Sequence, residues 1–252
     1  MILAIIQARM SSKRFPGKVL KPILGVPMLL RQIERVKCAS LIDQLVIATS
    51  EEPSDDPIAQ LCLENNILSF RGSLDNVLDR FYKAAKPFSP EHVVRLTGDC
   101  PLIDPELINK IIKYHLDHQF HYTSNTLEPT FPDGLDIEVF QFLSLKKAWE
   151  NADLQHQMEH VTPYIYENRE FFSLGSYKND LDLSNLRWTV DEKVDYELVV
   201  KIYEALYCSE TIFTIHDILN YLDENQELKN LNKHIGRNEG YNHSLLEIKK
   251  EG

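Results

Sequence analysis

The first 120 residues alternate apolar runs of strand length with segments of helical periodicity, and this alternation restricts the fold more than any other feature. Residues 2–8 form an apolar run, as expected of a strand covered on both faces. Leu29, Ile33 and Val36 then recur at helical spacing. Strand and helix in regular succession predict parallel strands joined by right-handed crossovers. We therefore expect an α/β fold whose mostly parallel central sheet is flanked by helices.

The same patterns predict the remaining elements. Further strands are expected over residues 45–48, 67–70, 93–96, 134–140, 171–177 and 186–190. Further helices are expected at a Ser54 cap and over residues 77–85, 107–112, 144–152, 156–169, 194–206 and 216–223. The chain becomes polar from Glu224, so we predict one domain over residues 1–223 and a polar extension over residues 224–252.

Charge and composition exclude several functional classes. The 252 residues include 27 basic and 38 acidic side chains, a formal net charge of −11, which disfavours nucleic acid or an anionic membrane as a partner. The four cysteines form no CxxC pair, and the apolar N-terminal run is too short for a signal sequence. No stretch approaches the ~20 apolar residues that span a bilayer. These features predict a cytoplasmic protein with reduced cysteines.

The loop after the first strand, residues 7–18, concentrates positive charge in this acidic chain. It contains four basic side chains and no acid: Arg9, Lys13, Arg14 and Lys18. Their mutual repulsion is relieved by an anion, and Ser11, Ser12 and loop N–H groups add donors for phosphate oxygens. The motif of a Walker loop is absent. We interpret the segment as a triphosphate-binding loop; the alternative is a solvated basic loop.

Two acidic positions are candidate magnesium ligands. Asp99 ends an apolar strand whose loop opens at the ligand-binding edge of a parallel sheet. It serves either as a metal ligand or as a turn-capping residue before Pro101. Asp191 ends an extended run, but with Glu192 and Asp195 it equally suits the acidic first turn of a helix. Spacing alone leaves both alternatives open.

Other polar positions have weaker signals. Arg71 and Ser73 follow a strand and are candidate base or ribose contacts, or else a turn with a solvent-facing arginine. His115, His118 and His121 have spacing that suits a metal, but no strong further ligand lies near them in the sequence. We interpret these histidines as a solvated helix face.

Five ordered blocks of this chain resemble one family of enzymes. The blocks are residues 5–20, 95–104 (RLTGDCPLID), 132–140 (PDGLDIEVF), 159–166 (EHVTPYIY) and 187–198 (RWTVDEKVDYEL). They are similar to the spore coat polysaccharide cytidylyltransferase-like family and, a step further, to the Kdo and acylneuraminate cytidylyltransferases. The resemblance extends to about residue 220. It implies a Rossmann-like nucleotidyltransferase fold of the glycosyltransferase A type, with a small β-containing acceptor and dimerisation lobe near residues 120–180.

The resemblance also implies roles for individual residues. It pairs Asp191 with Asp99 on Mg²⁺, and it makes both catalytic together with Arg9 and Lys18. The implied nucleotide contacts are Ala8, Arg9, Ser11, Ser12, Lys13, Arg14, Lys18, Arg71, Ser73, Thr97 and Gly98. Thr97 stands where related families have a base-contacting Gln. The implied acceptor contacts are Asn125, Asp133, Glu138, Glu159 and His160.

The expected activity follows from these roles. An acceptor oxygen attacks the α-phosphorus of CTP, pyrophosphate leaves, and CMP is joined to an acidic sugar of the nonulosonic type. His160 orients the acceptor or removes a proton, or else is a hydrogen-bonded helix histidine. We expect a homodimer that uses CTP and a small acidic acceptor. The alternatives are a phosphonate or phosphorylated acceptor, and a catalytically silent nucleotide-binding subunit.

Overall fold

In the computed structural model, residues 1–237 are described, and residues 238–252 of the predicted polar extension lie outside the described residues. The strands are β1 (Ile2–Gln7), β2 (Pro22–Ile23), β3 (Val26–Pro27), β4 (Gln44–Ser50), β5 (Leu68–Gly72), β6 (His92–Thr97), β7 (Tyr122–Ser124), β8 (Glu138–Gln141) and β9 (Leu174–Ser176). The α-helices are α1 (Met28–Val36), α2 (Asp56–Glu64), α3 (Val77–Ala85), α4 (Pro105–His118), α5 (Phe142–Asn151), α6 (Gln155–His160), α7 (Pro163–Glu167), α8 (Lys193–Leu206), α9 (Ile215–Glu224) and α10 (Gln226–Lys229). Short 3₁₀ turns are η1 (Lys18–Leu20), η2 (Pro53–Asp55) and η3 (Lys86–Phe88).

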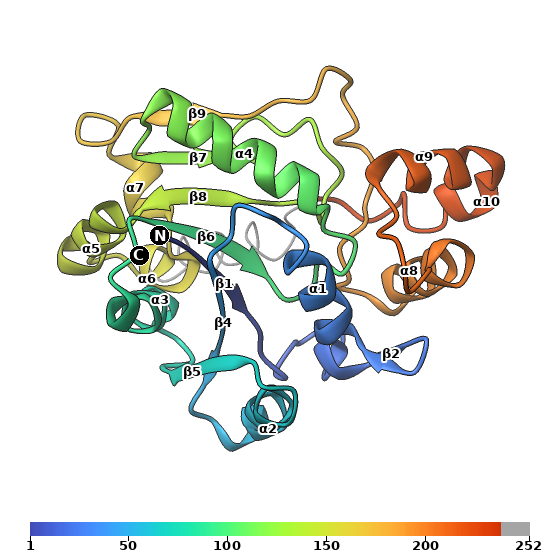
Figure 1. Ribbon diagram of the computed structural model, residues 1–252, viewed down its shortest axis with the longest axis horizontal. Helices are drawn as coiled ribbons and strands as arrows, with labels where there is room; N and C mark the ends of the chain where they lie inside the picture. The colour runs from blue at the N-terminus through green and yellow to red at the C-terminus, as the bar shows by residue number, and fades with distance from the viewer. Residues whose placement is uncertain (238–252) are drawn as a thin grey trace.

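Seven strands form one twisted sheet in the order β5-β4-β1-β6-β8-β7-β9 (Figure 1). β1 pairs in parallel with β4 and β6, and β4 pairs in parallel with β5. β8 runs antiparallel to β6 and β7, whereas β9 is parallel to β7. β2 and β3 form a separate antiparallel hairpin. The predicted mostly parallel central sheet is confirmed.

Helices cover both faces of the sheet because β1 is apolar on both. Ala4 and Ile6 pack into one hydrophobic core with side chains of α1, α2, α4, α8 and α9. Leu3 and Ile5 point the opposite way, into a second core with side chains of α3 and α5. Figure 1 shows α8, α9 and α10 grouped to one side of the sheet, away from α5 and α7. The two cores confirm the flanking helices.

The ends of neighbouring strands approach closely at Gly98, directly after β6. Its N–H donates to the Gln7 carbonyl at 2.8 Å. A Cβ at this position would lie 2.9 Å from the same carbonyl oxygen and 3.0 Å from the Ala8 Cβ. Only glycine permits this approach, which brings the loop after β1 beside the loop after β6. Both loops open at the carboxyl edge of the parallel strands, where ligands bind in such sheets.

Several predicted elements differ from the observed ones. The helix expected over residues 156–169 is split into α6 and α7, because Val161 has a φ of 74° and Pro163 begins the second helix without an N–H to donate. The strand expected over 134–140 is confined to β8. Residues 186–190 form no regular strand; Arg187 makes an isolated bridge to Asp133.

The region near residues 120–180 supplies β7, β8 and β9, which extend the main sheet, and helices α5 to α7. The described part of the polar extension packs against the domain: Asn232 is 2% exposed and donates to Asp195 at 2.8 Å, and Arg237 donates to Asp136 at 2.6 Å. Within residues 1–237 no helix combines the length and apolarity that crossing a membrane requires.

Candidate active site

The basic loop after β1 is held in place by a buried carboxylate. Asp55 is fully buried and accepts from the Met10 N–H at 2.7 Å and from the Thr49 hydroxyl at 3.1 Å. At the far end of the loop, the Gly17 N–H donates to the Met10 carbonyl at 2.9 Å. Gly17 has a φ of 71°, a conformation that favours glycine. The loop is thus closed on itself and fixed to the sheet, and its basic side chains project from a defined backbone.

Asp99 and Asp191, which lie 92 positions apart in the sequence, converge on one ammonium group. Lys18 Nζ lies 3.0 Å from Asp99 Oδ2 and 2.8 Å from Asp191 Oδ1, and it donates to the Val190 carbonyl at 2.7 Å. The Val190 N–H donates to the Asp99 carbonyl at 2.8 Å and joins the two segments. The structure therefore brings the first loop together with both predicted acids.

The electrostatics of this cluster keep Lys18 and Asp99 charged. Burial lowers the pKa of Lys18, but the carboxylates of Asp99 and Asp191 outweigh burial and leave the pKa above its ordinary value. Burial likewise raises the pKa of Asp99, but the Lys18 charge and a hydrogen bond from Thr97 bring it down to about 2. At neutral pH Lys18 is therefore an ammonium ion and Asp99 a carboxylate.

The buried side chain of Arg187 holds Asp191 in place through an ion pair. Its guanidinium, 5% exposed, contacts Asp133 at 2.8 Å, Asp191 at 3.1 Å and Asp195 at 3.0 Å. Asp195 is fully buried and also accepts from the side chain of Asn232. Burial lowers the pKa of Arg187, but its bonds and charge pairing with these carboxylates raise it overall. The sequence patterns gave no role to Arg187, because a charged residue in an extended run has no pattern that reveals its partners.

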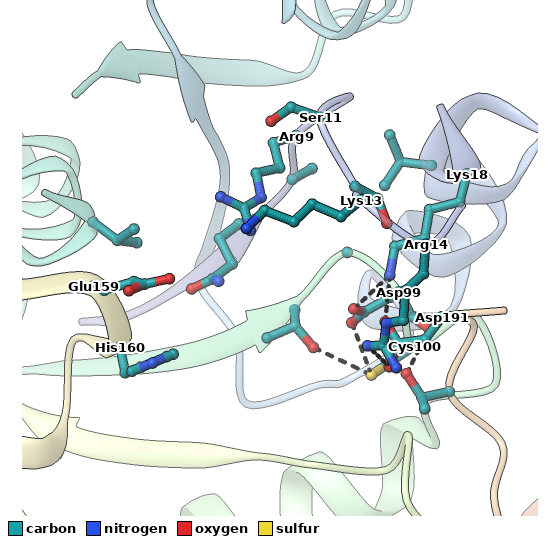
Figure 2. Close-up of a pocket in the computed structure, with 18 of the residues that line it drawn as sticks. Arg9, Ser11, Lys13, Arg14, Lys18, Asp99, Cys100, Glu159, His160 and Asp191 are labelled. Atoms are coloured by element: carbon teal, nitrogen blue, oxygen red, sulfur yellow. Dashed lines mark hydrogen bonds and ion pairs between the residues drawn. The ribbon is translucent and has the colours of Figure 1, made fainter. Parts of the chain in front are cut away.

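A cavity of about 910 Å³ opens beside these groups. Figure 2 shows Lys18, Asp99 and Asp191 at one end, Glu159 and His160 at the other, and Arg9 and Lys13 between them. Within residues 1–237, no hydrogen bond or ion pair occupies the side chains of Arg9 and Lys13. Fourteen of the predicted site residues line the cavity: Ala8, Arg9, Ser11, Ser12, Lys13, Arg14, Lys18, Thr97, Gly98, Asp99, Asp133, Glu159, His160 and Asp191.

Four predicted site residues are not among those lining the cavity. Arg71 donates to the Ser50 and Glu52 carbonyls and pairs with Asp56 at 2.7 Å, so it braces the loop after β4. The Ser73 hydroxyl accepts from the Asn76 N–H at 3.0 Å, as in a turn that precedes a helix.

The other two are buried in the predicted acceptor region. Asn125 is fully buried, and its side chain hydrogen-bonds to the backbone. It donates to the Leu135 carbonyl and accepts from the Ile137 N–H. Glu138, 8% exposed, accepts from Arg95 and from the hydroxyls of Tyr122 and Thr162. Glu138 therefore binds Arg95 and is not itself part of the cavity wall.

Some lining residues have no clear signal in the sequence. Gln7, Arg80 and Arg95 lie in a strand or helix whose apolar neighbours dominate the pattern, and Asp75 and Asp136 lie in short polar loops. The alternation of side chains along β6 does place Arg95 on the same face as Thr97. That periodicity was the available clue for Arg95.

The histidines of α4 differ from the expected solvated face. His115 is fully buried between His92, whose ring nitrogen lies 3.0 Å away, and the Thr123 hydroxyl at 2.9 Å. Burial, aided by the His92 charge, lowers the pKa of His115 to about 3. The prediction of a solvated face is wrong for His115, since it faces the sheet from α4.

The carboxylate pair fits a magnesium ion. Within the described residues no group of three or more His, Cys, Asp or Glu side chains suits a metal. Mg²⁺, however, commonly uses one or two carboxylates and completes its shell with waters and substrate phosphates. Asp99 and Asp191 already converge on a cation, the Lys18 ammonium, and their side chains are 26% and 20% exposed toward the cavity. The donor set and its opening therefore suit magnesium.

Comparison with known proteins identifies relatives over most of the chain. A family model described as "Cytidylyltransferase" matches residues 3–236. The chain is 38% identical over 236 residues to an uncharacterized protein of Methanocaldococcus jannaschii, covering 93% of this chain and 95% of that protein. It is 35% identical over 209 residues to the spore coat polysaccharide biosynthesis protein SpsF of Bacillus subtilis, covering 81% and 86%.

A solved structure agrees with the sequence relatives. The fold is similar to that of a cytidylyltransferase from Leptospira borgpetersenii, with a TM-score of 0.85 and 33% sequence identity. The likeness covers 90% of this chain and 96% of the Leptospira chain. The predicted nucleotidyltransferase fold is thereby confirmed.

Proposed function

Because this chain belongs to the cytidylyltransferase family, we propose that it transfers CMP from CTP to a small acidic sugar and releases pyrophosphate. The observation that carries the proposal is the meeting of a basic loop with two carboxylates at the edge of one cavity, through Lys18, Asp99 and Asp191. The relation to a polysaccharide biosynthesis protein and the resemblance to Kdo and acylneuraminate cytidylyltransferases support an acidic sugar of the nonulosonic type as acceptor.

The phosphates of CTP suit the basic side of the cavity. Arg9 and Lys13 extend into it without protein partners among residues 1–237, so both are available to an anion. Arg14 and Lys18 stand beside them; Arg14 pairs with Asp191 at 2.9 Å and Lys18 with both acids. Two unit charges about 4 Å apart attract each other by roughly 4 kcal/mol at an effective dielectric of about 20, and solvent screening reduces the net gain from an exposed pair. A triphosphate therefore has enough cationic contacts to bind firmly.

Asp99 and Asp191 would hold Mg²⁺, and the bound ion would neutralise charge on the phosphoryl oxygens. Other side chains of the protein hold these two carboxylates in place. Lys18 joins them, and Arg187 donates to the second oxygen of Asp191 at 3.1 Å. Preorganised ligands of this kind contribute through positioning, which is the main role of a protein in phosphoryl and nucleotidyl transfer.

The remaining part of the cavity suits the acceptor. An acceptor hydroxyl oxygen forms a bond to the α-phosphorus, the bond from that phosphorus to the bridging oxygen of pyrophosphate breaks, and the hydroxyl proton moves to a base. His160 lies at the end of the cavity away from Asp99 (Figure 2). Burial, with the charges of Arg95 and His156, lowers the pKa of His160 to about 4, so its ring is neutral at pH 7 and suited to orient the acceptor through a hydrogen bond.

The test is turnover by the purified protein with CTP, MgCl₂ and a panel of 2-keto sugar acids, monitored by pyrophosphate release. We expect release with at least one acid and with CTP in preference to ATP, GTP and UTP. CTP binding without release from any acid, phosphonate or phosphorylated acceptor would indicate a silent nucleotide-binding subunit. Absence of binding to every nucleotide would remove the proposal.

A further inference from the structure

Arg80 is a buried cation on the cavity wall. It lies on α3 with 2% of its surface exposed, and its Nη1 donates to the Ser73 carbonyl at 2.6 Å. Its Nε has no hydrogen-bond partner, and no carboxylate among residues 1–237 forms an ion pair with it. The Asp55 carboxylate attracts this charge but forms no ion pair with it, and a buried charge without a direct partner costs several kcal/mol in effective terms. The arrangement therefore favours an anion supplied by a ligand.

Two further guanidinium groups adjoin Arg80. Arg9 and Arg95 also line the cavity, and after burial their positive charges contribute to lowering the pKa of Arg80 to about 10. The ordinary pKa of an arginine exceeds 12, so the surroundings of Arg80 disfavour its charged form. Three like charges on one wall repel one another, and a bound anion would convert that repulsion into attraction.

Arg95 is fixed in place by a buried network. Its Nε donates to the Gln7 side chain at 3.1 Å, and its Nη1 donates to Glu138. Glu138 in turn accepts from the Tyr122 hydroxyl at 2.6 Å and the Thr162 hydroxyl at 2.7 Å. Every oxygen of this carboxylate is therefore occupied, and the guanidinium is held in one orientation. Its Nη2, which forms no hydrogen bond with residues 1–237, remains to donate to an acid group.

This network belongs to the acceptor end of the cavity. Thr162, which holds Glu138, follows Glu159 and His160 by two to three residues. Figure 2 shows Glu159 and His160 across the cavity from Asp99 and Asp191. Arg95 is therefore connected to the wall opposite the proposed metal ligands, whereas Lys18 and Arg14 stand beside those ligands.

We propose that Arg80 and Arg95 form a subsite for the carboxylate of the acceptor. The assignment rests on the proposed function, in which the acceptor's nucleophilic oxygen must reach the α-phosphorus beside Asp99 and Asp191. Its acid group then extends along the cavity toward the Arg95 wall. Arg9, Lys13, Arg14 and Lys18 remain for the phosphates, so the two anions of the reaction occupy separate sets of cations.

Pyruvate is a probe for this subsite, because it carries the carboxylate and adjacent carbonyl carbon of a 2-keto sugar acid. Its binding to the protein saturated with CTP and MgCl₂ is measured by NMR titration of ¹³C-labelled pyruvate, with pyruvamide as the uncharged analogue. We expect the wild type to bind pyruvate and not pyruvamide, and Arg80→Met to bind pyruvate at least tenfold more weakly. Arg95→Lys keeps the charge beside Glu138 but loses the fork, and we expect the same direction of change.

The control is Lys83→Met on the same helix, whose side chain is 55% exposed and pairs with Asp79 at 2.8 Å. Calorimetric Kd values for CTP should agree within twofold among wild type, R80M and K83M. Pyruvate binding that is absent from the wild type, or equal in R80M, would overturn the subsite. A tenfold loss of CTP affinity in R80M would assign the wall to nucleotide phosphates and also overturn it. Failure of the wild type to bind CTP would refute the proposed function instead. If R80M does not fold, Arg80→Gln replaces it in the same measurements.

Discussion

Replacing Arg187 with Met tests the network that fixes the second carboxylate. The guanidinium is almost fully buried and contacts three acids, so its removal leaves Asp133, Asp191 and Asp195 without their shared cation. Removing one partner of a buried ion pair costs about 3–5 kcal/mol. Asp195 keeps donors from the Asp191 and Glu192 N–H groups at 3.0 and 2.9 Å. We therefore expect the lower end of that range, about 3 kcal/mol of unfolding free energy.

Urea denaturation at pH 7 measures this loss, with unchanged slope and a lower midpoint for R187M. The control is Lys201→Met, which breaks an exposed pair with Glu204 on α8 and should cost less than about 1 kcal/mol. Combining R187M with Asp195→Asn should recover part of the loss, because the double variant removes one of the uncompensated charges. A loss below about 1 kcal/mol in R187M, or no recovery in the double variant, would refute the reasoning.

Three further predictions concern single positions. Lys13→Met should weaken CTP binding about tenfold by calorimetry, since about 1.4 kcal/mol of phosphate attraction is lost. Lys21 lies outside the cavity, and Lys21→Met should change the Kd for CTP less than twofold. Equal Kd values for wild type and Lys13→Met would count against the phosphate role. Gly98→Val should lower unfolding free energy by about 1–3 kcal/mol, because its Cβ would meet the Gln7 carbonyl at 2.9 Å, and an unchanged thermal midpoint would contradict this close approach. His115 has a folded pKa of about 3, below the ordinary 6.5, so the unfolded chain binds the proton first and stability falls as pH drops from 6.5 toward 3. Its share between pH 6.5 and 4.5 is about 2.3 kcal/mol, and His115→Gln should flatten the pH dependence of the urea midpoint; an identical slope would disprove the assignment.

The sequence predicts the first half of the fold well because its signals are local. Apolar runs such as residues 2–8 and the helical spacing of Leu29, Ile33 and Val36 are set by neighbours in the chain, and β1 and α1 form there. The insertion of β8 between β6 and β7 depends on pairing across more than 40 residues, for example Arg95 with Glu138. No periodicity specifies such a register, so the antiparallel part of the sheet was not predicted.

The site shows the same division. The basic loop is visible in the sequence as four cations after a strand, and the structure brings it to the cavity. The alternatives for Asp191 could not be separated by spacing, since Asp195 does cap α8 while Asp191 faces Lys18. Arg80 and Arg95 were missed because their significance lies in burial and in partners from distant segments. Arg71 was assigned to the nucleotide from its place after a strand, but it turns toward Ser50 and Asp56.

The central claim is that the basic loop and the Asp99–Asp191 pair form one site for a nucleotide and its divalent ion. Electron paramagnetic resonance titration of Mn²⁺, with CTP present, measures this directly in wild type, Asp99→Asn and the exposed control Asp117→Asn. The predicted result is tight Mn²⁺ binding in wild type and D117N, and binding at least tenfold weaker in D99N, whose fold is intact by circular dichroism. Equal Mn²⁺ affinity in D99N and wild type would contradict the claim.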